Sequence, residues 1–177
     1  ISHVWMQTYF DTHGVPVKPG LRELLDFLKA NGCTCALATS SNRSVADYYL
    51  ADAHLADYFS VLVCGDEVTR SKPDPQTFLL AMQKLGAQSP AQCAVFEDSR
   101  NGLLAGATGG FPVFLVPDLI EPTPEMQALL PGLLPWTRQE LLSCRRHGQT
   151  SGRKLRQLRL EPLRSAGRER RVKGDVR

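Results

Sequence analysis

Short apolar runs alternate with amphipathic stretches along the first two thirds of the chain. Apolar residues at helical spacing predict helices over 21–29, 43–50, 76–85 and 100–107. Short apolar runs predict buried strands over 33–38, 60–64, 93–96 and 112–116. This alternation is typical of an α/β fold in which right-handed crossovers connect the strands of a parallel sheet. The segment before residue 17 carries no comparable pattern, and we expect it to be irregular.

Composition divides the chain into two unlike parts. With 177 residues, 42% of them hydrophobic and 22% charged, it has the composition of a globular protein with about one domain. Residues 1–135 hold 8 Lys/Arg against 14 Asp/Glu, whereas residues 136–177 hold 13 against 4. The second part is therefore predicted to be a disordered basic tail. Such a tail either contacts nucleic acid or another acidic surface, or is merely solvated.

The apolar stretches and the cysteines indicate where in the cell the protein is located. The longest apolar stretches fall far short of the roughly 20 residues that cross a bilayer, and no leader-like segment opens the sequence. The cysteines are not at metal-ligand spacing, which favours free thiols in a reducing environment; they are Cys33, Cys35, Cys64, Cys93 and Cys144. We therefore expect a cytoplasmic protein with no membrane partner.

Polar side chains follow three of the predicted strands, where the chemistry of parallel sheets gathers. After the first strand, the Thr39 hydroxyl and the amides of Ser40 and Ser41 form a donor cluster that suits a phosphate. The same cluster is also ordinary helix N-capping sequence, and capping remains an alternative. Before the third helix, prolines at 73 and 75 restrict the loop that carries Lys72, which favours an anion partner over a merely solvated lysine.

The third of these strands ends at two adjacent carboxylates, Glu97 and Asp98. Their mutual repulsion requires a cation or hydrogen-bond donors, and Mg²⁺ with several waters suits such a pair. Alternatively, one carboxylate caps the helix that starts near Arg100. Together the donors, the lysine and the carboxylates indicate phosphate chemistry, although no activated nucleophile is recognisable among these residues.

Five segments in this order resemble the haloacid dehalogenase-like hydrolase superfamily. They match most closely the branch of beta-phosphoglucomutase and phosphoglycolate phosphatase, over about residues 17–120. The segments are Lys18-Pro-Gly-Leu-Arg-Glu-Leu-Leu, Leu37-Ala-Thr-Ser-Ser, Gly65-Asp66, Ser71-Lys-Pro-Asp-Pro and Val95-Phe-Glu-Asp-Ser-Arg-Asn-Gly102.

The resemblance implies a Rossmann-like parallel sheet with flanking helices, and it implies a role for each candidate residue. Thr39 and the amide of Ser40 bind phosphate. Lys72 and Thr39 are the catalytic residues, Lys72 pairs with the nucleophile and the phosphate, and Glu97 and Asp98 hold Mg²⁺. The implied activity is a Mg²⁺-dependent phosphatase acting on a small phosphorylated metabolite through a phospho-aspartate. A sugar-phosphate mutase, and a noncatalytic remnant that binds phosphate or nucleic acid, remain alternatives.

One family motif has no counterpart in this sequence. The nucleophile of the family lies in an Asp-x-Asp motif at the end of a central strand, and no Asp-x-Asp occurs in the 177 residues. Asp11 is only a superficial echo of it. We therefore expect an N-terminally incomplete member, with residues 1–16 a remnant of the cap, 17–135 the core domain and 136–177 the tail. Loss of the central strand would leave its neighbours with unpaired edges and give marginal stability.

Overall fold

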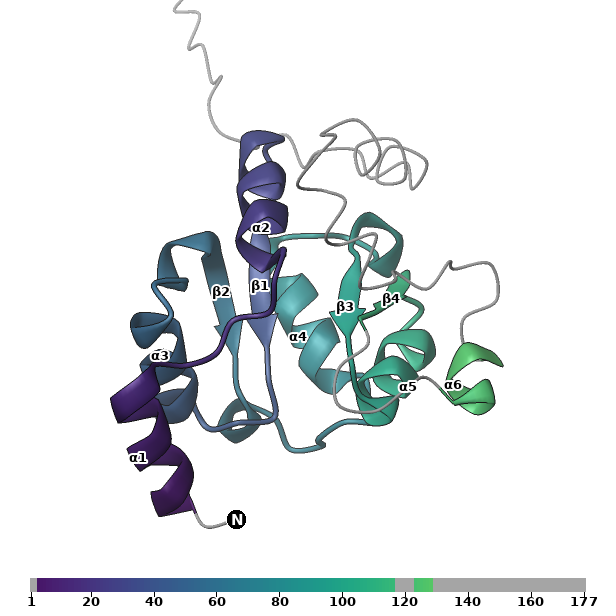
Figure 1. The fold of residues 1–177 in the computed structure, drawn as a ribbon. Coiled ribbons are helices and arrows are strands. Elements are labelled where there is room, and N and C mark those ends of the chain that lie inside the picture. The colour runs from purple at the N-terminus through teal and green to yellow at the C-terminus, as the bar shows by residue number, and fades with distance from the viewer. Residues whose placement is uncertain (1–2, 117–122, 129–177) are drawn as a thin grey trace, which may run out of the picture.

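The protein alternates strands and helices, as the periodicity predicts. A computed structural model describes residues 3–116 and 123–128. Its helices are α1 (His3–His13), α2 (Leu21–Ala30), α3 (Arg43–Asp52), α4 (Gln76–Leu85), α5 (Arg100–Thr108) and α6 (Pro124–Ala128) (Figure 1). Its strands are β1 (Cys35–Ala38), β2 (Phe59–Val63), β3 (Val95–Glu97) and β4 (Val113–Leu115). The predicted basic tail over 136–177 lies outside the described residues.

The strands form two parallel pairs instead of the single continuous sheet that the strand pattern suggests. β1 pairs with β2, and β3 pairs with β4, each in parallel register. In the described residues β1 and β3 therefore have a strand partner on one edge only. β4 is buried throughout, but β1 is only half-buried along its length, which corrects the prediction of a buried first strand.

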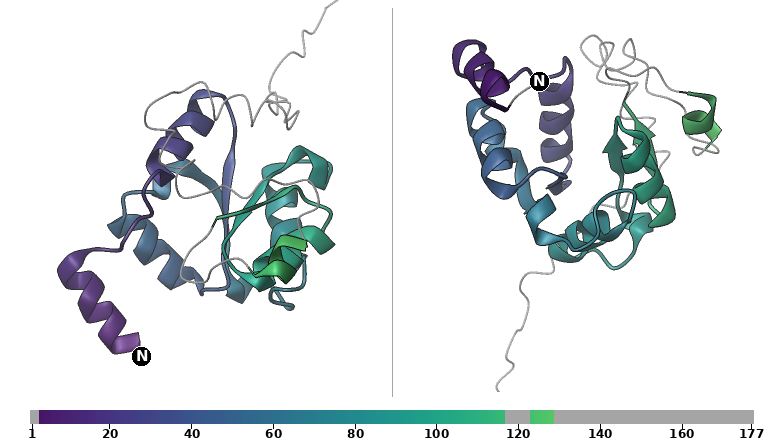
Figure 2. Two further views of the ribbon diagram at one scale, coloured as in Figure 1. Left: turned by 45° about the vertical axis from the view of Figure 1, so that its right-hand side comes forward. Right: turned by 90° about the horizontal axis from the view of Figure 1, so that it is seen from below.

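An apolar cavity is lined mainly by residues 15–24 and α3, and it reaches both strand pairs. Its volume is about 360 Å³, and its lining includes Leu37 and Thr39 from the β1 side and Phe96 and Val116 from the side of β3 and β4. Helix α4 contacts both β1 and β2 and also touches α5, so it links the two halves. Figure 2 shows the halves side by side, connected through the α4 region.

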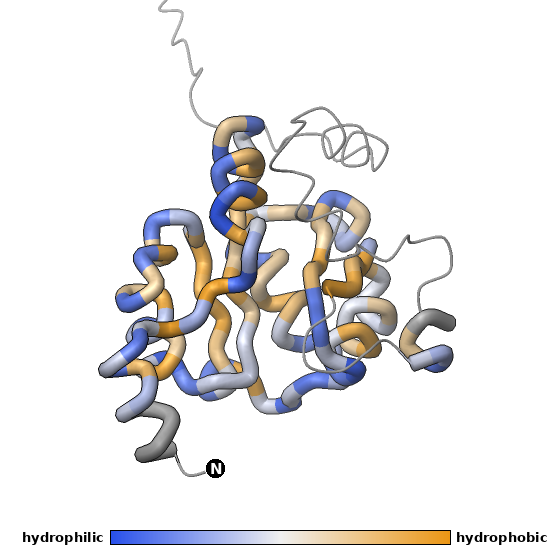
Figure 3. The backbone as a smooth tube through the Cα atoms, viewed as in Figure 1, coloured by the Kyte–Doolittle hydropathy of each residue, from blue (hydrophilic) through white to orange (hydrophobic). Residues whose placement is uncertain are grey.

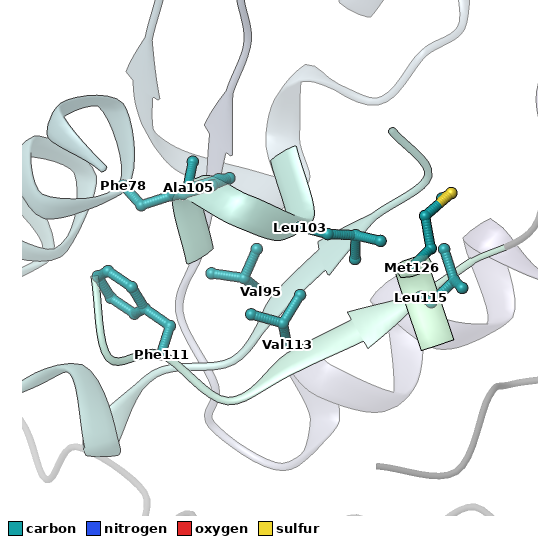
Figure 4. Close-up of a cluster of buried hydrophobic side chains, with 8 residues drawn as sticks. All are labelled: Phe78, Val95, Leu103, Ala105, Phe111, Val113, Leu115 and Met126. Carbon is teal, nitrogen blue, oxygen red and sulfur yellow. The ribbon is translucent and has the colours of Figure 1, made fainter. Parts of the chain in front are cut away.

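Two hydrophobic clusters stabilise the two halves. One gathers under β3, β4 and α5 around the fully buried Leu103 and includes Phe78 of α4 (Figure 4). The other joins Leu25 of α2 and Leu50 of α3 to half-buried side chains of β1 and β2. Because α4 contributes to the first cluster and packs on β1, the apolar core also holds the strand pairs at a fixed spacing.

The N-terminal segment is helical, which corrects the expectation of an irregular opening. The Phe10 ring packs edge-on against Tyr49 of α3, with the ring centroids 5.5 Å apart. Asp11 accepts a hydrogen bond from the Tyr48 hydroxyl at 2.7 Å, and Asp52 accepts one from the Val15 amide. These contacts with α3 stabilise the helical conformation of the N-terminal segment. They could not be predicted from the local pattern of apolar residues.

Two further sequence expectations can be compared with the structure. Within residues 3–116 and 123–128, no helix is both long and apolar enough to cross a bilayer. The four described cysteines are free, as predicted, and burial raises the pKa of the Cys35 and Cys93 thiols. These thiols are therefore protonated at neutral pH and poor nucleophiles.

Truncation of a core side chain should show how much the cluster around β3 and β4 contributes to the free energy of unfolding. Leu103→Ala removes a side chain that is fully buried, and it should lower the free energy of unfolding by about 2–5 kcal/mol. Leu79→Ala, at a position 38% exposed on α4, is the matched control and should cost less than about 1 kcal/mol. Urea unfolding followed by circular dichroism measures both, and equal losses would contradict this assignment of the core.

Candidate active site

The loop that follows β1 is fixed by hydrogen bonds on both sides. The Thr39 amide donates to the Val63 carbonyl at 2.9 Å, which extends the pairing of β1 with β2. The Thr39 hydroxyl oxygen accepts from the Ser41 amide at 3.1 Å, so the hydroxyl proton remains available to an anion. The N-cap residue of α3 is Asn42, whose side chain makes no capping hydrogen bond. Capping therefore does not account for Thr39, Ser40 and Ser41.

The loop that follows β2 packs against the Thr39 loop and is hydrogen-bonded to it. The Gly65 amide donates to the Ser41 carbonyl at 2.8 Å. A side chain at position 65 would place its Cβ 2.3 Å from the Ser40 carbonyl oxygen, so only glycine permits this approach. The Asp66 carboxylate accepts from the Arg43 amide at 3.2 Å, at the start of α3. The loop is thus held in one conformation before any ligand binds.

Lys72 reaches across the space between the two strand pairs. Its ammonium donates to the carbonyl of Ala38, the last residue of β1, at 3.1 Å, and it forms an ion pair with Glu97 at the end of β3. It also lies 4.5 Å from the centroid of the Phe78 ring. The side chains of Lys72 and Glu97 are only 10% and 9% exposed. The lysine is therefore directed into the site, not into solvent.

The two predicted carboxylates occupy different surroundings. Glu97 is mostly covered, with one oxygen on Lys72 and the other accepting from the Ser99 hydroxyl at 3.0 Å. Asp98 follows directly and is exposed. Neither caps α5, because its N-cap is Ser99, whose oxygen accepts from the Gly102 amide. The alternative reading of this pair as a helix cap is therefore wrong, and Figure 3 shows hydrophilic residues gathered where β3 runs into α5.

The arrangement suits a hard divalent cation that keeps most of its water. Mg²⁺ in proteins is usually held by one or two carboxylates together with substrate phosphates. Glu97 and Asp98 supply that number, and Glu97 keeps one unused lone pair on the oxygen that binds Lys72, because its other oxygen accepts from both the hydroxyl and the amide of Ser99. Within the described part of the chain, no group of three or more His, Cys, Asp or Glu side chains is placed to hold a metal. The residues present therefore fit a partial Mg²⁺ site.

The structure brings Lys72, Glu97 and the Thr39 loop together and keeps Asp11 in another contact. Lys72 bonds the residue that immediately precedes Thr39. Asp11 lies on α1, where its carboxylate accepts from the Tyr48 hydroxyl. The hydrogen bond from Ser99 to Glu97 could not be predicted from the sequence, because it depends on the direction of the Glu97 side chain.

Removal of one partner of the Lys72–Glu97 pair should destabilise the protein, because the other charge is then covered and unpaired. Lys72→Met leaves a covered carboxylate without its cation and should lower the free energy of unfolding by about 3 kcal/mol. In a double-mutant cycle, adding Glu97→Gln should restore part of this loss. The control is Lys84→Met, which breaks the more exposed pair with Glu67 and should cost about 0–1 kcal/mol. Additive losses in the cycle would show that the two side chains do not interact.

Comparison with known proteins agrees with this geometry. A family model described as haloacid dehalogenase-like hydrolase matches residues 5–110. Protein CbbY of Rhodobacter capsulatus is 42% identical over 106 residues, which is 58% of this chain and 46% of that protein. The phosphorylated carbohydrates phosphatase of Thermotoga maritima is 41% identical over 92 residues, or 52% of this chain and 42% of that protein.

A solved structure of a related protein is similar to this chain. CbbY from Rhodobacter sphaeroides in complex with phosphate is 30% identical with a TM-score of 0.53, covering 58% of this chain and 46% of that one. The chain thus spans about half the length of the curated relatives that it matches. With the family model matching more than half of its residues, the chain belongs to the haloacid dehalogenase-like hydrolases, in the branch that includes phosphatases and phosphomutases.

Proposed function

We propose that this chain carries part of the active site of a Mg²⁺-dependent hydrolase of small phosphate monoesters. The observation that carries the proposal is the position of the Lys72 ammonium, which contacts the ends of both β1 and β3 and lies next to the Thr39 loop. The relatives support it, since one is named as a phosphatase of phosphorylated carbohydrates and another was solved with phosphate. The substrate class proposed is a small phosphorylated metabolite.

Each residue has a role that follows from its chemistry. The Thr39 hydroxyl and the Ser40 amide donate to oxygens of the phosphate at the start of α3. Lys72 offsets the negative charge of the phosphoryl group in a site where surrounding side chains exclude most water. Glu97 and Asp98 hold Mg²⁺, which would supply further charge neutralisation when it is bound.

The attacking group comes from outside this sequence in the proposed mechanism. An aspartate carboxylate forms a bond to phosphorus while the bond to the ester oxygen breaks, and a general acid of the same motif gives its proton to the departing alcohol. That group then takes a proton from water, whose oxygen attacks phosphorus and breaks the bond to the aspartate, so that inorganic phosphate is released. We place the strand that bears this aspartate between β1 and β3, because each has a strand partner on one edge only in the described residues, and residues of both, Leu37 and Phe96, line one apolar cavity.

A phosphomutase would use the same residues. It would differ only in returning the phosphoryl group to a sugar instead of water. Release of inorganic phosphate from a sugar phosphate, compared with formation of an isomeric sugar phosphate, distinguishes the two outcomes.

Turnover of an aryl phosphate tests the proposal. We expect no hydrolysis by the 177-residue chain and Mg²⁺-dependent hydrolysis by a version with the Asp-x-Asp strand and cap restored upstream. In the restored protein Lys72→Met should lower kcat at least about 100-fold, as expected for loss of a group that stabilises the transition state. Lys84→Met is the matched control and should leave kcat unchanged.

Either of two results would contradict this proposal. Hydrolysis by the chain alone that is abolished by Lys72→Met would place the nucleophile within these 177 residues, and Asp11→Asn would be the next variant. An inactive restored protein that still binds phosphate would favour a noncatalytic binding role.

A further inference from the structure

The Glu97 carboxylate is held at both of its oxygens. One oxygen pairs with Lys72, and the other accepts from the Ser99 hydroxyl at 3.0 Å. A carboxylate that is held at a single oxygen can still rotate about its terminal bond, whereas two contacts fix the plane of the group. Oε2 also accepts from the Ser99 amide at 3.5 Å, so the lone pair that remains for a cation is on Oε1, the oxygen that binds Lys72.

Ser99 is directed at Glu97 by its second hydrogen bond. Its oxygen accepts from the Gly102 amide at 3.0 Å, in the first turn of α5. A hydroxyl has a single proton, and the Gly102 amide uses a lone pair and not that proton. The proton therefore remains for the Glu97 oxygen. The helix start thus fixes the direction in which Ser99 donates.

Gly102 makes room for the carboxylate directly against the helix. A Cβ built at position 102 would lie 2.0 Å from both Cδ and Oε2 of Glu97. The carboxylate therefore lies against the N-terminal turn of α5, where the helix dipole favours negative charge. The Ser99 hydroxyl and the space left by Gly102 together favour one orientation of the Glu97 carboxylate.

We propose that Ser99 is a positioning residue, and that its hydroxyl, acting through Glu97, sets the affinity of this strand end for a divalent cation. The inference rests on the proposed function, in which Glu97 and Asp98 hold the metal. Ser99 itself contacts neither substrate nor metal. Groups that orient a metal ligand in this way typically change metal affinity by about 10–100-fold when they are removed.

Mn²⁺ binding to the full 177-residue chain tests this inference. Broadening of the backbone amide signals near Gly102 during a Mn²⁺ titration reports binding locally and does not require catalysis. Ser99→Ala should weaken Mn²⁺ binding about 10-fold or more. Ser99→Thr keeps a hydroxyl and should bind Mn²⁺ like the unmodified chain.

A third variant separates positioning from helix capping. Glycine at an N-cap costs little stability compared with alanine, but it has no hydroxyl to donate. Ser99→Gly should therefore lose Mn²⁺ affinity as Ser99→Ala does, while its thermal unfolding stays closer to that of the unmodified chain. If Ser99 were only a helix cap, Mn²⁺ affinity would not fall in Ser99→Gly.

The outcomes distinguish this inference from the proposed function. Equal Mn²⁺ affinity in the unmodified chain, Ser99→Ala and Ser99→Gly would overturn the positioning role of Ser99. It would not contradict the proposed metal site. Absence of local broadening in the unmodified chain, or broadening that Glu97→Gln does not change, would overturn the metal site and this inference with it.

Discussion

The contact of Lys72 with both Ala38 and Glu97 is the interaction on which the arrangement of this site depends. β1 and β3 belong to different strand pairs, and no described backbone hydrogen bond connects those pairs as a sheet. Lys72 joins the carbonyl at the end of one strand to the carboxylate at the end of the other. An ammonium group with such limited exposure needs these acceptors, because burying an unpaired charge is very costly. The ends of the two strands are therefore held to the same ammonium group.

Apolar packing gives this polar contact a rigid base. α4 begins four residues after Lys72, contacts β1 and β2, and contributes Phe78 to the cluster around Leu103. The Phe78 ring also lies beside the Lys72 ammonium, which favours its position through the ring electrons. Helix α4 thus packs against β1 and β2 and places Phe78 beside the Lys72 ammonium. The proposed function requires only that a phosphate, a metal and an aspartate enter a site already arranged around Lys72.

Much of this could be predicted from the sequence because it depends on local pattern. The helices and strands follow periodicity, and Thr39, Lys72, Glu97 and Asp98 stand at predicted strand or loop ends. The division into two strand pairs could not be predicted from strand patterns alone, because pairing depends on partners distant in the chain. Helix α1 depends on the rings and carboxylates of α3, and the role of Ser99 depends on one side-chain direction.

Binding of inorganic phosphate to the full chain in the presence of Mg²⁺ tests the central claim most directly. In a nuclear magnetic resonance titration, we expect shifts of the amide signals of Thr39, Ser40 and Ser41 that disappear in Lys72→Met and persist in Lys84→Met. Shifts that are confined to other parts of the chain, or that survive Lys72→Met unchanged, would contradict a phosphate site built around Lys72.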